Sequence, residues 1–296
     1  MEINTILAKS LLIKNKDLSW FGAEYNMNLY KGCCHGCIYC DSRSACYQIE
    51  KFDTVRVKEN ALQILRDELR RKVKTGIIFT GSMSDPYNPL EGKLELTRHA
   101  LELINAYGFG ISIATKSHLM IRDIDILKAI KNQAPVLAKI TITTADDEVA
   151  KKVEPHVCVS SKRFETVRAL SEEGIFTGLL MMPILPFIED NEENIYEIVK
   201  KAHESGAKFI YPTIGMTMRL GQREYFYEKL DEHFPGIKNQ YIKTYGTTYQ
   251  CVSPKVKALF KLFATECQQR GILYQMPAII RAYQEGYQTQ QLSLFE

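Results

Sequence analysis

Short apolar runs alternate with amphipathic helical patterns along most of this 296-residue chain, and this alternation restricts the fold more than any other feature. The apolar runs are rich in β-branched residues, as buried parallel strands are, and the segments between them repeat apolar residues at spacings of three and four. The expected strands are 25–30, 76–80, 110–115, 138–143, 175–182 and 208–213. The expected helices between them are 59–73, 94–106, 123–131, 161–173 and 191–205. Six strands in this rhythm predict a parallel α/β fold, either a partial barrel or a doubly wound sheet.

The alternation stops near residue 215, and the remaining sequence is predicted to be mostly helical, with helices over 219–233 and 254–270. A Tyr- and Lys-rich segment lies between these helices. It suits phosphate contact and base stacking, and it equally suits an ordinary surface loop. We therefore expect four parts in the chain: an N-terminal segment 1–24, an α/β barrel 25–215, a C-terminal extension 216–287 and a flexible tail 288–296.

Composition favours a cytoplasmic protein. The net charge of +3 permits a polyanionic partner but gives little support for one. The N-terminus carries Glu2 and no basic region, and Lys9 interrupts its apolar run, so we expect no signal peptide. No stretch reaches the roughly 20 apolar residues of a membrane span. Four of the eight cysteines lie within residues 33–40, which indicates a metal or cluster site and not a disulfide framework.

The cysteine cluster has the spacing C-x3-C-x2-C, formed by Cys33, Cys37 and Cys40. Three thiolates on one short loop can each bind one iron of a four-iron cluster and leave the fourth iron open to another ligand. A structural zinc site is the alternative, with Cys34 or His35 as the fourth ligand, but no second C-x2-C pair follows. The spacing favours the iron–sulfur cluster.

This spacing, with the aromatic Tyr39 directly before the last cysteine, resembles the motif of the radical S-adenosylmethionine (SAM) superfamily. Further stretches resemble its spore photoproduct lyase-like branch, a group of DNA repair enzymes. These stretches are the cysteine loop 30–40, Ser-Asp-Pro-Tyr at 84–87, Ala-Thr-Lys-Ser at 114–117, Thr-Ile-Thr-Thr at 141–144, Glu-Pro at 154–155 and Pro-Ile-Leu-Pro at 183–186. Together they span roughly residues 25–215 of the chain.

The resemblance implies a partial parallel (β/α)6 barrel with a [4Fe-4S] cluster and SAM as cofactors. SAM would bind the open iron, and one electron from the cluster would release a 5′-deoxyadenosyl radical that removes a hydrogen atom from the substrate. The barrel would orient these groups and exclude water. The resemblance also implies the cofactor contacts Tyr39, Ser84, Asp85, Lys116, Thr141 and Thr143.

Each of these contacts has a simpler alternative. Ser84 and Asp85 begin a strong turn signal. Lys116 is also compatible with an exposed lysine at a strand end. Thr141 and Thr143 share one strand face, which either lines the barrel lumen or has no role beyond β-structure.

Two positions depart from the branch. Photoproduct lyases carry a cysteine directly before the Ser-Asp pair as hydrogen donor, whereas this chain has Met83, whose thioether has no S–H. It also has Asp41 where the branch has tyrosine. Cys46 and Cys251 are candidate replacements for the donor. Cys158 and Cys267 also remain, although a buried structural role suits all four cysteines better.

The tail carries a second signal. Gln291, Leu292, Leu294 and Phe295 belong to a Gln-Leu-Ser-Leu-Phe peptide that resembles the clamp-binding motif of bacterial DNA repair and replication proteins. Leu294 and Phe295 would fill an apolar site on the sliding clamp. Packing of the tail on its own domain is the alternative.

These features predict a radical SAM enzyme, lyase-like, that acts on a damaged or modified base in DNA. The expected partners are DNA, the sliding clamp and an electron donor such as flavodoxin or ferredoxin. One alternative is radical chemistry on RNA, a peptide or a small molecule. The other is a non-catalytic, clamp-tethered iron–sulfur factor, which the cofactor-contact residues disfavour.

Overall fold

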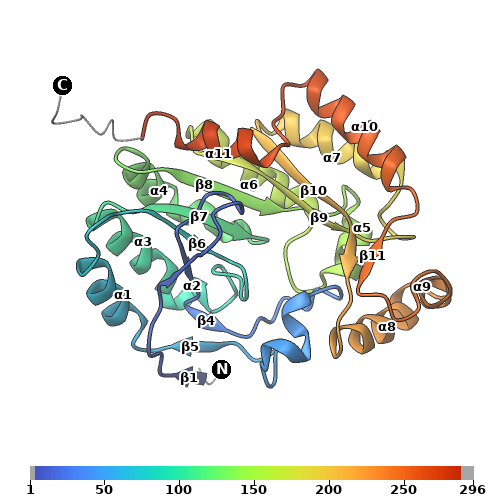
Figure 1. Ribbon diagram of the computed structural model, residues 1–296, viewed down its shortest axis with the longest axis horizontal. Helices are drawn as coiled ribbons and strands as arrows, with labels where there is room; N and C mark the ends of the chain where they lie inside the picture. The colour runs from blue at the N-terminus through green and yellow to red at the C-terminus, as the bar shows by residue number, and fades with distance from the viewer. Residues whose placement is uncertain (1–3, 288–296) are drawn as a thin grey trace.

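The computed structural model describes residues 4–287 and is built around a sheet of eight strands (Figure 1). Six of them are parallel and adjacent in chain order: β3 (Tyr25–Met27), β6 (Ile77–Thr80), β7 (Gly110–Thr115), β8 (Val136–Thr141), β9 (Phe176–Ile184) and β10 (Phe209–Thr217). Short antiparallel strands, β2 (Ile13–Lys14) and β11 (Gln250–Val252), form the two edges. A doubly wound sheet reverses its strand order in the middle. The uninterrupted order here confirms the partial parallel barrel.

Helices between the strands cover the outer side of the sheet (Figure 1). They are α1 (Ala61–Arg70), α3 (Leu96–Ala106), α4 (Ile124–Lys131), α6 (Ser160–Glu172) and α7 (Glu192–Glu204). Each lies within a few residues of its expected range, because each presents an apolar face to the strands. In α1, Leu65 and Leu69 are buried as the spacing predicts. Val73 was expected on the same face, but it is 99% exposed because the helix ends at Arg70.

Several short elements had no clear signal in the sequence. A second sheet joins β1 (Asn4–Ile6), β5 (Arg56–Lys58) and β4 (Tyr30–Lys31). The 3-10 helices η1 (Asp41–Arg43) and η2 (Ala45–Tyr47) follow the cysteine loop. Helix α2 (Glu91–Leu94), the 3-10 helix η3 (His118–Asp123) and helix α5 (Asp147–Val153) follow three of the barrel strands. These elements are too short for their hydrophobic period to be recognised.

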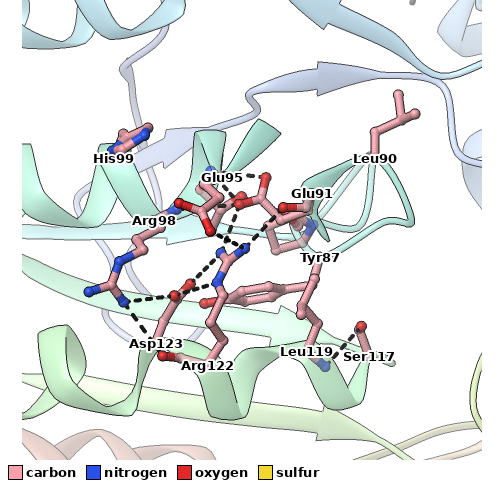
Figure 2. A network of polar contacts seen from close by, with 12 residues as sticks. Tyr87, Leu90, Glu91, Glu95, Arg98, His99, Ser117, Leu119, Arg122 and Asp123 are labelled. Carbon is pink, nitrogen blue, oxygen red and sulfur yellow. Dashed lines mark hydrogen bonds and ion pairs between the residues drawn. The ribbon is translucent and has the colours of Figure 1, made fainter. Parts of the chain in front are cut away.

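A buried network of acids and arginines fixes the loop after β6 (Figure 2). The carboxylates of Glu91 and Asp123 have no exposed surface. The Arg122 guanidinium lies 2.9 Å from Glu91 Oε1 and 2.8 Å from Asp123 Oδ1, and Arg98 adds a contact of 3.1 Å to Asp123. Buried carboxylates are tolerated only when they are paired in this way. The network ties α2 and α3 to η3 and so holds the far end of the loop after β6 in place.

The C-terminal extension is mostly helical, as expected, and consists of α8 (Gln222–His233), α9 (Ile237–Tyr245), β11, α10 (Val256–Gln269) and α11 (Met276–Gln284). The first part of the Tyr- and Lys-rich segment forms α9, and its last residues lead into β11 with Tyr249 exposed. Tyr241 is fully buried there, with its ring 5.1 Å from Phe226 and 5.4 Å from Phe187. The Tyr245 hydroxyl donates to the carbonyl of Val252 at 2.7 Å. These two tyrosines therefore pack α9 against α8, the segment after β9 and β11.

The N-terminal segment closes one end of the barrel. Phe21 is fully buried and packs against Phe209 at the start of β10, 5.8 Å between ring centroids. Ile279 and Tyr283 of α11 belong to the same apolar cluster. The amino ends of the strands are thus plugged, and the site described below lies at their carboxyl ends. Within residues 4–287, no helix is long and apolar enough to cross a membrane.

Candidate cluster and cofactor site

The cysteine loop runs from residue 32 to residue 40 and is fixed by backbone contacts on both sides. The amide of Cys33 donates to the carbonyl of Phe52 at 2.9 Å, and the amide of Ile38 donates to the carbonyl of Val153 at 3.0 Å. Gly32 has φ +82°, and a Cβ there would lie 2.5 Å from the carbonyl oxygen of Thr54. Only glycine fits this close approach.

Cys33, Cys37 and Cys40 line one cavity of about 260 Å³ at the carboxyl ends of β6, β7, β8 and β9. Cys34 is not part of its wall and packs against the main hydrophobic core. Among the described residues, no three His, Cys, Asp or Glu side chains converge on a single metal ion. A four-iron cluster does not need such convergence, because each thiolate binds a different iron.

Burial keeps the three thiols protonated in the absence of a bound metal. Burial, reinforced by the charge of Asp85, raises the pKa of Cys33 to about 12. Burial also raises the pKa of Cys37 and of Cys40. Buried thiols of this kind become thiolates only beside strong positive charge, and coordinated iron supplies it. The donor set therefore suits an iron–sulfur cluster.

Ser84 and Asp85 line the same cavity and also bind neighbouring loops. The Ser84 hydroxyl donates to the carbonyl of Gly32 at 2.7 Å. The Asp85 carboxylate accepts from the hydroxyl of Thr115 at 2.6 Å and from the amide of Lys116 at 2.8 Å. These bonds connect the loop after β6 to the cysteine loop and to the end of β7. We propose that Asp85 acts on a cofactor mainly by positioning these two elements.

Lys116 is half-buried at the end of β7, with its Nζ 5.7 Å from the centroid of the Tyr39 ring. Burial alone would lower the pKa of Lys116, but the nearby Cys37 and acidic groups raise it overall. Thr141 also lines the cavity. Thr143 does not: β8 ends at Thr141, and the Thr143 hydroxyl donates to the buried Glu189 carboxylate at 2.7 Å. The expectation that both threonines face the lumen holds only for Thr141.

Sequence reasoning missed the role of a buried chain of polar groups behind Tyr39. The Tyr39 hydroxyl donates to the carboxylate of Glu154, which forms a buried ion pair of 2.5 Å with Arg163. Arg163 donates to the carbonyls of Thr141 and Cys158, each at 2.8 Å. The Glu-Pro pair at 154–155 stood out in the sequence. Its hydrogen-bond partner, Tyr39, could not be recognised because it lies more than one hundred residues away. The lone Trp20, another wall residue of the cavity, gave no signal at all.

A second cavity, of about 460 Å³, lies beside the first, over the ends of β9 and β10 and the edge strand β11. Its accessible lining is mainly apolar. The two cavities share five wall residues: Tyr39, Cys40, Ser42, Ser82 and Met182. A molecule in the second cavity would therefore be adjacent to the group that the cysteines hold.

The candidate hydrogen donors do not line either cavity. Cys46 is exposed on η2, with its sulfur 3.1 Å from Arg219. Cys251 is buried and belongs to the apolar cluster beneath α8 and α9, and burial raises its pKa to about 11. Cys158 donates to the carbonyl of Lys116 at 3.2 Å, and Cys267 is in the main core. Neither Cys46 nor Cys251 lines the wall of either cavity, so the geometry does not favour them as donors.

A partial parallel barrel whose carboxyl edge carries three cysteines on one loop defines a class of enzymes that use an iron–sulfur cluster in catalysis. Comparison with known families specifies the class further. The model of the Radical SAM superfamily matches residues 27–202, and the chain belongs to this superfamily. Its cofactors are a [4Fe-4S] cluster and SAM.

Relatives by sequence occur in bacteria, archaea and a virus. Uncharacterized proteins of Mycobacterium bovis and Mycobacterium tuberculosis are 28% identical over 247 residues, which is 81% of this chain and 72% of theirs. An uncharacterized protein of Methanocaldococcus jannaschii is 35% identical over 179 residues, covering 60% of this chain and 66% of its own.

Solved structures support the fold. Spore photoproduct lyase complexed with dinucleoside spore photoproduct superposes with a TM-score of 0.65 at 17% identity, covering 91% of this chain and 80% of that one. The radical SAM methyltransferase TsrM from Kitasatospora setae superposes with a TM-score of 0.56 at 12% identity, covering 88% of this chain and 58% of that one.

The clamp-like residues Gln291, Leu292, Leu294 and Phe295 lie outside the described residues.

Proposed function

We propose that this radical SAM enzyme acts on DNA, at a damaged or modified base, in a lyase-like repair reaction. The observation that carries the proposal is the pair of adjoining cavities. One holds the three cysteines, Lys116 and Thr141, and the other is larger, mainly apolar and open to a planar group such as a base. Spore photoproduct lyase, which shares the fold, has been solved with a dinucleoside lesion.

The bound cluster and SAM supply a strongly reactive radical when reduced, and the protein residues prepare the site for it. We propose that Cys33, Cys37 and Cys40 bind the cluster and that the Lys116 ammonium binds the carboxylate of SAM. The Tyr39 ring is placed between the two cavities, and Glu154 fixes its orientation. When cofactor and substrate fill both cavities, they would keep water and other hydrogen donors away from the radical.

Met83 also lines the first cavity, with its sulfur 3.9 Å from the Ser42 hydroxyl. Because a thioether supplies no hydrogen atom, we propose that the lesion differs from the spore photoproduct.

We further propose a flavodoxin or ferredoxin as electron donor, a bacterial sliding clamp as partner of the tail, and a cytoplasmic location.

The decisive experiment is anaerobic reconstitution followed by a search for substrate-dependent 5′-deoxyadenosine across a panel of damaged duplex DNAs, RNAs and peptides. Formation of 5′-deoxyadenosine with damaged DNA, above the level with undamaged DNA, is the expected result. A response only to RNA, peptides or small molecules would replace the proposed substrate. Failure of any SAM cleavage by a fully loaded and reduced cluster would favour a non-catalytic iron–sulfur factor.

A further inference from the structure

The turn between β10 and α8 presents a leucine to solvent beside the second cavity. Leu220 is 73% exposed, although Thr217, three residues earlier, is part of the cavity wall. Two other exposed apolar side chains, Tyr249 and Val252, lie on the neighbouring strand β11 or directly before it. Val252 also lines the cavity. Leu220 is therefore one of several exposed apolar side chains near the second cavity and not an isolated exposed residue.

The turn is held rigidly in this position. The carbonyl of Leu220 accepts a hydrogen bond from the amide of Ala45 at 3.0 Å. The side chain of Gln222 donates to the carbonyl of Tyr39 at 2.9 Å, and its oxygen accepts from the amide of Arg219 at 3.0 Å. The turn is thus fixed directly to the cysteine loop. A leucine that is held out in water by a rigid backbone loses little further entropy when it enters an apolar partner.

Arg219 adds a positive charge next to Leu220. Its guanidinium contacts Asp41 at 3.5 Å, the sulfur of Cys46 at 3.1 Å and the hydroxyl of Tyr249 at 2.8 Å, yet the side chain remains 35% exposed. A guanidinium carries five N–H groups, so these three contacts leave donors for an anion. An oriented, partly exposed arginine beside an apolar side chain suits the alternating phosphates and bases of a nucleic acid.

Chemistry on a base within a duplex requires that the base leaves the stack, and proteins that open a stack commonly insert an apolar side chain between base steps. We propose that Leu220 is such a wedge, that Arg219 binds a phosphate flanking it, and that the displaced base enters the second cavity. This inference rests on the proposed function, because it requires duplex DNA as substrate. It assigns recognition of the duplex to the turn 218–221 and reception of the base to the β9–β10–β11 cavity.

The test uses the full-length protein and a short duplex in which one 2-aminopurine faces cytosine, because 2-aminopurine becomes strongly fluorescent when it leaves the stack. Binding is followed in parallel by anisotropy. The wild-type protein is expected to bind and to raise the fluorescence. Leu220→Ala is expected to retain binding and to lose most of the fluorescence rise. Leu7→Ala is the matched control, since Leu7 is also 73% exposed but directly follows β1 of the small sheet, outside both cavity walls.

Arg219→Ala is expected to weaken binding to every duplex and to reduce the slope of log affinity against log salt by about 0.9, the value for one phosphate contact. Binding without a fluorescence rise in the wild type, or an equal rise in Leu220→Ala, would overturn the wedge and leave the DNA substrate standing. An unchanged salt slope in Arg219→Ala would overturn the phosphate contact. No binding of the wild type to damaged or mismatched duplexes would overturn the proposed DNA function itself.

Discussion

The hydroxyl of Tyr39 donates a hydrogen bond to the carboxylate of Glu154, a residue 115 positions further along the chain. Tyr39 lies between two of the cysteines and forms part of the wall of both cavities. Glu154 lies outside both walls and pairs with Arg163 in the protein interior. The geometry of the cysteine loop therefore depends on a buried ion pair that touches neither cavity.

Breaking this ion pair should destabilise the fold strongly. Glu154→Ala leaves the Arg163 guanidinium charged, buried and without its partner, and the expected loss in the free energy of unfolding is about 3–5 kcal/mol. Urea denaturation of the purified protein measures it. Glu148→Gln is the control, because Glu148 forms an exposed pair with Lys151, and its stability should match the wild type. Equal stabilities of Glu154→Ala and the control would show that the pair is not structurally important.

Alanine variants of the three cluster cysteines should differ in iron content from a variant of the neighbouring Cys34. Alanine at Cys33, Cys37 or Cys40 should largely abolish iron binding after anaerobic reconstitution, because each change removes the only protein ligand of one iron. Cys34→Ala should retain iron near the wild-type level, since Cys34 packs against the core and not against the cavity. Iron and sulfide assays with the absorption spectrum provide the measurement. Iron loss in Cys34→Ala equal to that of the other variants would mean that the ligands are misassigned.

Lys116→Ala should weaken SAM binding while the cluster remains. Loss of a charge-assisted contact to a carboxylate costs about 1.5–3 kcal/mol, or roughly ten- to a hundredfold in affinity. An anaerobic titration of the reconstituted protein measures the affinity, and the iron assay verifies the cluster. Lys93→Ala, at an exposed position on α2, is the control. If both variants bind SAM as the wild type does, Lys116 does not contact the cofactor.

Glu189 should make stability depend on pH. Burial raises its pKa to about 8, so the folded state holds a proton that the unfolded state releases above the ordinary glutamate range. The unfolded state binds fewer protons across this interval, and stability therefore falls as pH rises from about 4.5 towards 8. Glu189→Gln mimics the protonated acid and should flatten this part of the profile. Parallel profiles of the two proteins in urea denaturation from pH 5 to about pH 8 would contradict the assignment.

The tail should bind a sliding clamp independently of the radical chemistry. Deletion of residues 291–296 is expected to leave cluster content and SAM cleavage unchanged and to abolish clamp binding. Leu294→Ala combined with Phe295→Ala should have nearly the same effect, because it removes both apolar anchors. Calorimetric titration of the isolated tail peptide against the clamp measures the contact directly. Absence of heat, together with lower thermal stability of the truncated protein, would instead indicate a tail that packs on its own domain.

The sequence predicted the barrel well because buried parallel strands are short, apolar and followed by helices with a clear period. Strands β7 and β9 lie close to their expected ranges for this reason. The cysteine loop was equally clear, since its ligands are adjacent in sequence. Contacts between distant segments left no comparable signal. The pairing of Glu154 with Tyr39 and the position of Trp20 in the cavity wall depend on how the ends of the strands come together.

The same limit applies beyond residue 215. Cysteines were treated as possible donors because they contain S–H groups, but the pleat of β11 turns Cys251 into the apolar cluster while its neighbours Gln250 and Val252 line the second cavity. In the Tyr- and Lys-rich segment, Tyr241 and Tyr245 have the i, i+4 spacing of a helix face. Their mixture with lysines suited a binding surface and a surface loop equally, and the aromatic neighbours that bury Tyr241 come from α8 and from the segment after β9.

Helix α11 lies at the floor of the barrel, where Tyr283 packs with Phe21 and the Tyr287 hydroxyl, just beyond the helix, donates to the carbonyl of Lys131 at 2.6 Å. The cavities lie at the opposite, carboxyl ends of the strands. The described chain thus ends, at residue 287, on the side of the barrel away from the cavities, and we propose that a partner bound by the later residues is tethered from this side. Such a tether would keep the enzyme close to its substrate without covering the cavities. The contact with the tail's partner or the contact with the substrate could then be released while the other persists.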